Sequence, residues 1–153
     1  MRSALNGFLV DTNLLVHAYD STEGEKRRRA IGVLRTLGSS TQGSLSTQIL
    51  GEFFNTVTRR IPVPLSADDA ERSVAEYIAS WLVHAITPAV VLEAIRGAQR
   101  FHLAYWDALI WATAKLNQIP AVLSEDFQDG AILENVRFIN PLSSEFDLTV
   151  LES

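Results

Sequence analysis

Residues 7–13 read GFLVDTN, an apolar run that stops at an acidic residue. The uninterrupted apolar segment from Phe8 to Val10 is typical of a strand that is buried on both faces. Such strands occur in parallel sheets, and sites in these sheets gather beyond the carboxyl ends of the strands. We therefore expect the carboxylate of Asp11 at the edge of a sheet, followed at once by a short helix over Asn13–Tyr19.

Strands and helices are predicted to alternate along the rest of the chain. Further strands are predicted at Ser44–Ser46, Trp81–Ile86, Ala121–Ser124 and Val136–Ile139. Helices are predicted at Thr22–Gly38, Thr47–Arg59, Ser66–Ser80, Ala89–Arg100 and Tyr105–Leu116. In the first of these, Thr22 and Glu25 fit a capping box. The pattern predicts an α/β fold: a short parallel β-sheet flanked by helices on both faces, in an α/β/α sandwich.

Length and composition limit the function classes. The 153 residues suit a single domain spanning residues 1–153, with a hydrophobic core large enough to be stable without disulfide bonds or a structural metal. The absence of cysteine excludes a disulfide scaffold, a thiolate zinc site and a cysteine nucleophile. The net charge of -5 argues against a general nucleic-acid coat, but not against a nuclease with a metal-holding carboxylate cluster. Residues 1–10 do not read as an export signal and no run suits a membrane helix, so we expect a cytoplasmic protein without a membrane partner.

Four acidic residues stand out by their contexts: Asp11, Glu52, Asp107 and Asp126. Asp11 and Asp126 follow predicted strands, although Asp11 also suits a helix N-cap. Glu52 borders an apolar helix stripe made of Ile49, Leu50, Phe53, Phe54 and Val57. Asp107 shares its stripe with Ile110, Trp111 and Ala114, which predicts a charge on a buried helix face. A buried carboxylate is costly, so it must be paired, protonated or bound to metal.

If these four acids converge, their repulsion predicts a cation between them. Two carboxylates ~5 Å apart repel by about 3 kcal/mol at an effective dielectric constant of 20. Six such pairs would exceed ~10 kcal/mol, which rivals the stability of a whole domain. Oxygen ligands favour Mg²⁺ or Mn²⁺, whereas zinc selects histidine and cysteine. Such sites suit phosphodiester hydrolysis by metal-activated water.

The contexts of the four acids resemble those of PIN-domain ribonucleases, most closely the VapC-like toxins of toxin–antitoxin pairs. The segments that carry the resemblance are residues 8–13, FLVDTN, residues 48–53, QILGEF, residues 106–114, WDALIWATA, and residues 123–130, LSEDFQDG. The likeness extends from about Phe8 to Asn140 and Pro141. It rests on the order and setting of the acids together, since no single segment is specific.

The resemblance implies a site and an activity. Asp11, Glu52, Asp107 and Asp126 would surround one or two Mg²⁺ or Mn²⁺ ions, with Asp129 as a further or alternative ligand. The hydroxyl of Thr12 or Ser124 would support the ligands, and Asn13 would orient Asp11. The activity would be endoribonucleolytic cleavage of RNA. A cognate antitoxin would block the site, and the toxin would form a homodimer.

Other interpretations of the sequence remain open at this stage. A HAD-type phosphatase also begins with an apolar strand and an aspartate, but its general acid would stand at position 13, where this chain has Asn13. A PIN fold could also be retained as a catalytically silent binding module. The basic run from Lys26 to Arg29 and the pair Arg59 and Arg60 are explained as solvated helix surface and as favourable charges at a helix end. RNA contacts remain open for Arg27, Arg28 and Arg96.

Overall fold

The computed structural model describes residues 7–152. The interpretation of the N-terminus as lacking an export signal rests partly on residues 1–6, which lie outside the described residues. A six-stranded sheet forms the centre of the molecule, in the order β3-β2-β1-β4-β6-β5. The strands are β1 (Phe8–Val10), β2 (Gly43–Ser46), β3 (Leu82–His84), β4 (Ala121–Leu123), β5 (Ile132–Leu133) and β6 (Val136–Ile139).

Five of these strands are parallel, as the alternation of elements predicts, and β1 lies at the centre of the sheet between β2 and β4. All three residues of β1 and all three of β4 are buried. The register pairs Val10 with Leu123, so the residues that follow, Asp11 and Ser124, emerge side by side. Because the chain moves to opposite sides of β1 to form β2 and β4, this point is where the strand order reverses. Parallel sheets place their ligand sites at such a point.

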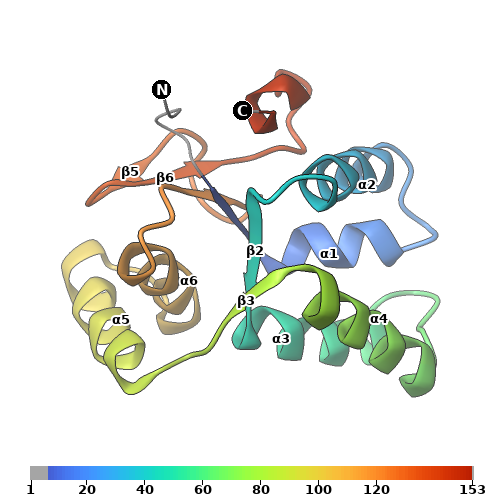
Figure 1. Ribbon diagram of the computed structural model, residues 1–153, viewed down its shortest axis with the longest axis horizontal. Helices are drawn as coiled ribbons and strands as arrows, with labels where there is room; N and C mark the ends of the chain where they lie inside the picture. Colours follow the sequence, from blue (N-terminus) through green and yellow to red (C-terminus); the bar gives the residue numbers. More distant parts are fainter. Residues whose placement is uncertain (1–6, 153) are drawn as a thin grey trace.

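Helices cover the two faces of the sheet (Figure 1). On one side lie α1 (Thr12–Tyr19) and α2 (Glu25–Gly38), and α3 (Thr47–Arg59) packs against α1 and α4 (Ala67–Ser80). On the other side lie α5 (Pro88–Phe101) and α6 (Tyr105–Leu116), which pack closely together. The predicted α/β/α arrangement is therefore confirmed. None of the helices in residues 7–152 is long and apolar enough to cross a membrane.

Two local features differ from the expectations. The predicted capping box at Thr22 is wrong: α2 begins at Glu25, and both the amide and the hydroxyl of Thr22 instead donate to Asp20 Oδ1. This competing turn is typical of an aspartate two residues before a hydroxyl side chain. The antiparallel edge strand β5 was not predicted either, because Ile132 and Leu133 form only a two-residue strand before the turn at Glu134 and Asn135.

The helix α6 carries the deepest part of the core. Seven consecutive residues, from Ala108 to Ala114, are buried in it. The buried Trp111 packs against Phe101 of α5 and donates its indole N–H to the carbonyl oxygen of Leu133. With the body of the helix fixed in this way, its first turn presents Asp107 at the same edge of the sheet as the ends of β1 and β4, as the electrostatic coupling of Asp107 with Asp126 and Glu52 indicates.

Candidate active site

Asp11 is buried at the end of β1 and is held by hydrogen bonds on both carboxylate oxygens. Its side chain is the N-cap of α1: Oδ1 accepts from the amide of Thr12 at 2.7 Å. The second oxygen, Oδ2, accepts from the hydroxyl of Ser124 at 2.8 Å. Only 5% of Asp11 is exposed. The capping role suggested by the sequence is therefore present, and it coexists with a second contact that reaches the neighbouring strand.

The loop after β4 is joined to α1 by the amide of Asn13. Its Nδ2 donates to Ser124 Oγ and to Asp126 Oδ2, both at 3.1 Å, and lies 3.5 Å from Asp11 Oδ2. Its Oδ1 accepts from the amide of Glu125 at 3.3 Å. The expected orienting role of Asn13 therefore extends to Asp126 more directly than to Asp11. Asn13 fixes the position of one acid relative to the other.

Glu52 enters the same cluster from α3. The hydroxyl of Thr12 donates to Glu52 Oε1 at 2.8 Å, although 40 residues separate the two in sequence. Gln48, one helical turn before Glu52, donates to Glu52 Oε2 at 3.3 Å and to the carbonyl oxygen of Trp106 at 3.1 Å. Through Gln48 the carboxylate of Glu52 is connected to the first turn of α6, where Asp107 lies.

The structure thus brings three of the predicted acids into one hydrogen-bonded cluster and places Asp107 close enough to be influenced by it. Burial raises the pKa of Asp107, and the charges of Asp126 and Glu52 raise it further. Asp107 is half-buried, not fully buried as its helix stripe suggested, because it belongs to the first turn of α6.

Asp129 lies apart from this cluster. It is exposed, and its Oδ1 accepts from the amide of Asn140 at 2.9 Å, beyond the end of β6. The charge of Asp126, in contrast, contributes to the raised pKa of both Asp11 and Asp107. These contacts favour Asp126 over Asp129 as the fourth acid of the site.

The electrostatics of the site are dominated by Asp11. Burial raises its pKa from 3.8 to about 7; the hydrogen bonds from Ser124 and Thr12 oppose that rise, and the charges of Asp126 and Glu52 add to it. The ionised form of this carboxyl is therefore poorly stabilised by the protein alone. A nearby cation would favour the ionised form.

The donor set suits a hard divalent cation, since it consists of carboxylate and hydroxyl oxygens without histidine or cysteine. As the side chains stand in residues 7–152, no group of three His, Cys, Asp or Glu is close enough to enclose an ion by itself. Two of the acids, Asp11 and Glu52, accept hydrogen bonds from the hydroxyl groups of Ser124 and Thr12.

One contact beside the site was not predicted. His17 of α1 lies between Glu125 and Glu23, and Lys26 of α2 donates to Glu125 Oε2 at 3.0 Å. Burial raises the pKa of Glu125, but the bonds from His17 and Lys26 outweigh it and hold that pKa below its usual value. The spacing of four residues between Asn13 and His17 places them on one face of α1, and this signal was available in the sequence.

The basic residues considered for RNA are mostly engaged elsewhere. Arg27 donates from its Nε to the carbonyl oxygen of Ala18 at 3.4 Å, and Arg28 pairs with Glu25. Arg29, in the same basic run, pairs with Glu25 and donates to the carbonyl oxygen of Ser143. Arg96 pairs with Glu93 and Glu134, on the α5 side of the molecule. Arg28, Arg29 and Arg96 are therefore held mainly in structural ion pairs.

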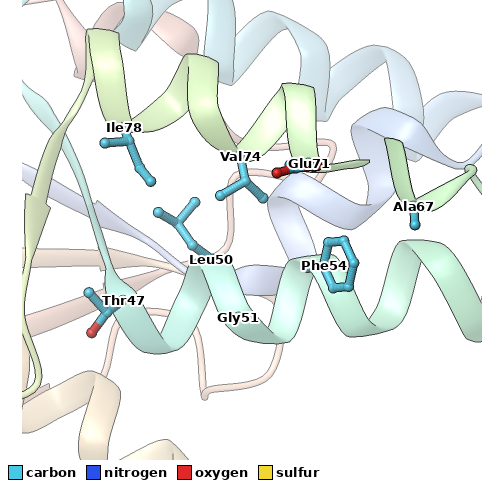
Figure 2. A pocket seen from close by; sticks show the side chains of 8 residues that line it. All are labelled: Thr47, Leu50, Gly51, Phe54, Ala67, Glu71, Val74 and Ile78. Carbon is cyan, nitrogen blue, oxygen red and sulfur yellow. The ribbon is translucent and has the colours of Figure 1, made fainter. Parts of the chain in front are cut away.

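A separate apolar groove of about 540 Å³ lies between α3 and α4 (Figure 2). Figure 2 shows Leu50 of α3 pointing toward Val74 and Ile78 of α4. The expectation that Phe54 faces the core is wrong, since it is 38% exposed and lines this groove. Part of the apolar stripe of α3 is therefore left uncovered by α4.

Comparison with known proteins agrees with this geometry. The model of the PIN domain family matches residues 8–130, a span that includes all four acids of the site. One similar solved structure is a toxin–antitoxin complex from Klebsiella pneumoniae, at 20% identity and a TM-score of 0.66, covering 88% of this chain and 98% of that chain. Another is VapC20 of Mycobacterium tuberculosis, a toxin that cleaves the sarcin–ricin loop, at 18% identity and a TM-score of 0.60, covering 78% of this chain and 90% of that chain. VapBC2 of Rickettsia felis, bound to a DNA fragment from its promoter, is similar as well. It has 11% identity and a TM-score of 0.62, and the match covers 86% of this chain and 96% of that chain.

At these identities the likeness to solved structures concerns the fold. A comparison with curated protein sequences gives no match. The family model, in contrast, matches residues 8–130, which is most of the chain. The chain belongs to the PIN domain family.

Proposed function

We propose that this protein is an endoribonuclease that cleaves RNA phosphodiester bonds with the help of Mg²⁺ or Mn²⁺. The observation that carries the proposal is the meeting of Asp11, Glu52 and Asp126, from three separate parts of the chain, in one network of hydrogen bonds through Thr12, Asn13 and Ser124. Asp107 flanks this network. A structural role alone does not account for so many acids around a carboxyl whose pKa is raised by its burial.

In this proposal Asp11, Glu52, Asp107 and Asp126 hold the cation. A bound divalent cation supplies Lewis-acid chemistry there: it lowers the pKa of water and offsets the negative charge that develops on the phosphate. Ser124 and Thr12 orient the oxygens of Asp11 and Glu52, and Asn13 keeps Asp126 beside Asp11. Water attacks the phosphorus and loses a proton, the bond from phosphorus to one ribose oxygen breaks, and that leaving oxygen takes up a proton.

The decisive experiment compares aspartate variants in an RNA cleavage assay with purified protein. Asp11→Asn and Asp126→Asn should lose cleavage while the far-ultraviolet circular dichroism stays unchanged. Asp129→Asn is the matched control and should retain cleavage, because Asp129 is bonded to the backbone of Asn140. Cleavage by Asp11→Asn at the rate of the unmodified protein would contradict the mechanism. A chelator should abolish activity, and Mn²⁺ or Mg²⁺ should restore it.

The two alternatives predict different results. A catalytically silent PIN module would bind RNA equally well with chelator and would never cleave it. A HAD-type phosphatase would form a phosphoaspartate on Asp11, which acid quenching with a labelled phosphomonoester would trap. The contacts of Asn13 argue against the phosphatase, since its amide orients neighbouring groups and has no acidic proton to give.

We further propose that the enzyme is the toxin of a toxin–antitoxin pair, that it acts in the cytoplasm, and that it forms a homodimer. In this proposal a cognate antitoxin inhibits the enzyme by binding an apolar segment in the α3–α4 groove. The similar solved structure from Klebsiella pneumoniae is a toxin–antitoxin complex. The groove is lined by Leu50 and Phe54 of α3, the helix that carries Glu52 on another face.

Coexpression tests this partner. The chain should arrest growth when it is produced alone, and a small protein encoded beside it should relieve the arrest. The Phe54→Asp variant should still cleave RNA, and the small protein should not relieve the growth arrest that it causes. The growth arrest caused by Leu92→Asp, at an exposed position of α5, should be relieved as for the unmodified protein. Equal relief of both variants would contradict the groove as the seat. Light scattering of the purified protein tests the homodimer.

A further inference from the structure

A second hollow, of about 630 Å³, opens directly beside the carboxylates. Thr12 and Glu52 form its inner wall, and the rest of its lining consists of Asn55, Thr56, Arg60 and Trp106. Glu52, Asn55, Thr56 and Arg60 follow one another at helical spacing along one face of α3 and its C-cap. The hollow is therefore a polar extension of the candidate active site, and it lies on a different face of α3 from the apolar groove.

Trp106 lines this hollow from the first turn of α6. The residue is 62% exposed, whereas Trp111 is fully buried and Trp81 is half-buried. Its backbone is held by the bond from Gln48 to its carbonyl oxygen, and its ring stands edge-on to Tyr105, with centroids 5.1 Å apart. An exposed indole beside the site is available for a stacking contact with a bound ligand.

Arg60 supplies the positive charge of the hollow. Seven lysine and arginine side chains within residues 7–152 form ion pairs with carboxylates, and Arg60 is not among them. Its guanidinium is exposed and lines the hollow near Glu52. In a chain with a net charge of -5, an arginine without a carboxylate partner beside an acidic site is suited to bind an anion that enters that site.

We propose that this hollow binds one nucleotide of the RNA next to the bond that is cut. Its base stacks on Trp106, and a phosphate of the same strand contacts Arg60. The amide of Asn55 can both donate to and accept from a base edge. The inference rests on the proposed function for the nature of the bond that is cut. Base stacking on an aromatic side chain, combined with a cation for the backbone, is how proteins bind single-stranded nucleic acid.

The lining favours a nucleotide over a segment of the antitoxin. Four of the six lining residues carry hydroxyl, amide or carboxylate groups and one carries a guanidinium, so Trp106 is the one apolar side chain. The groove between α3 and α4 has the opposite character, with Leu50, Phe54, Val74 and Ile78 in its lining. The two hollows therefore suit two chemically different occupants.

Fluorescence titration tests the proposal. A single-stranded RNA of about six nucleotides is added to the Asp11→Asn protein, in which cleavage is prevented. We expect the RNA to quench tryptophan fluorescence. Adding Trp106→Ala should remove that quenching and raise the Kd about tenfold, as measured by anisotropy of labelled RNA. Trp106→Phe should restore most of the affinity, since it keeps an aromatic face.

Arg60→Ala should also raise the Kd, and it should lower the slope of log Kd against log salt concentration by about 0.7, the value for one phosphate contact on a single strand. Arg59→Ala is the matched control, because Arg59 is the adjacent exposed arginine and does not line the hollow. Leu92→Ala is the control for loss of exposed apolar surface. Both controls should leave the Kd unchanged.

The outcomes separate this proposal from the proposed function. If Asp11 is required for cleavage but Trp106→Ala leaves the Kd unchanged, the nucleotide site is wrong and the nuclease stands. If no cleavage is found while RNA still quenches the fluorescence of Trp106 and the affinity for RNA still depends on Arg60, the proposed nuclease activity is wrong and the nucleotide site stands. A loss of antitoxin inhibition in Trp106→Ala at unchanged RNA affinity would overturn the proposal in favour of a protein contact.

Discussion

The hydroxyl of Ser124 donates to Asp11 Oδ2 at 2.8 Å, across 113 residues of sequence. The same hydroxyl oxygen accepts from the amide of Asp126 at 3.0 Å and from Asn13 Nδ2 at 3.1 Å. It is almost fully buried, with 1% of the residue exposed. One serine therefore determines how the carboxylate at the end of β1 sits relative to the acid that follows β4.

The first prediction concerns this serine. Ser124→Ala removes a bond that lowers the pKa of Asp11, so that pKa should rise further above its present value of about 7. At neutral pH the cation must then displace a proton, and the Kd for Mn²⁺ should increase by about tenfold or more. Calorimetric titration measures it. Ser46→Ala, at the buried serine that ends β2, removes a helix cap and should leave the Kd for Mn²⁺ unchanged.

The second prediction concerns the pH dependence of stability without metal. The pKa of Asp11 is about 7 in the folded protein against 3.8 as its ordinary value. Between these values the folded state binds more protons than the unfolded state, so the free energy of unfolding falls as pH rises. Lowering the pH from about 7.5 to about 5.5 should stabilise the protein by about 2 kcal/mol through this group.

Thermal melts in chelator, compared between the protein and Asp11→Asn, isolate that contribution. The comparison is needed because burial lowers the pKa of His84, which acts in the opposite direction over part of this range. The carboxyls of Glu93 and Glu134, whose pKa values are lowered to about 2 by Arg96 and Lys115, lose their contribution only in more acidic solution. An identical pH profile for both proteins would contradict the assignment of the raised pKa to Asp11.

The sequence was sufficient to predict what depends on local pattern. Buried strands produce uninterrupted apolar runs, so the sequence alone locates the ends of β1 and β4. It therefore also places the acids beyond these ends, Asp11 and Asp126, at one edge of the sheet. The helix stripes likewise gave the boundaries of α3 and α6 within a residue or two.

What the sequence could not give depends on how neighbouring elements are spaced. Phe54 belongs to the apolar stripe of α3, yet it is exposed because α4 does not cover it. The raised pKa of Asp11 depends on how deeply the folded chain buries that carboxyl. The availability of Arg60 depends on the other charges of the described residues, none of which forms an ion pair with it although Glu52 lines the same hollow. Periodicity in one segment contains no information about these distances between segments.

The third prediction tests the close contact of α5 with α6. A Cβ atom on Gly97 would lie 2.4 Å from Cζ3 of Trp111, whose indole is fixed by its bond to Leu133. Gly97→Ala should therefore destabilise the protein by about 1–3 kcal/mol. Gly51→Ala is the matched helical control: nothing lies within 4 Å of its added Cβ, so it should stabilise α3 by roughly 0.5–1 kcal/mol. Urea unfolding measures both, and equal effects of the two substitutions would refute the tight packing at Gly97.

The last prediction concerns His17, whose Nε2 contacts the carboxylate of Glu125 from α1. Glu125 immediately precedes Asp126, and its amide donates to Asn13, so this contact restrains the loop that carries the fourth acid. His17→Ala should lower kcat for RNA cleavage about tenfold with little change in KM, because Asp126 loses its fixed position while the surface that binds RNA is kept. His17→Gln keeps a donor and should recover part of the rate. Lys26→Met removes the second, more exposed bond to Glu125 and should cost less than His17→Ala. If His17→Ala left kcat unchanged, the contact would serve only to pack α1 against the loop, and the position of Asp126 would have to be attributed to Asn13 and Ser124 alone.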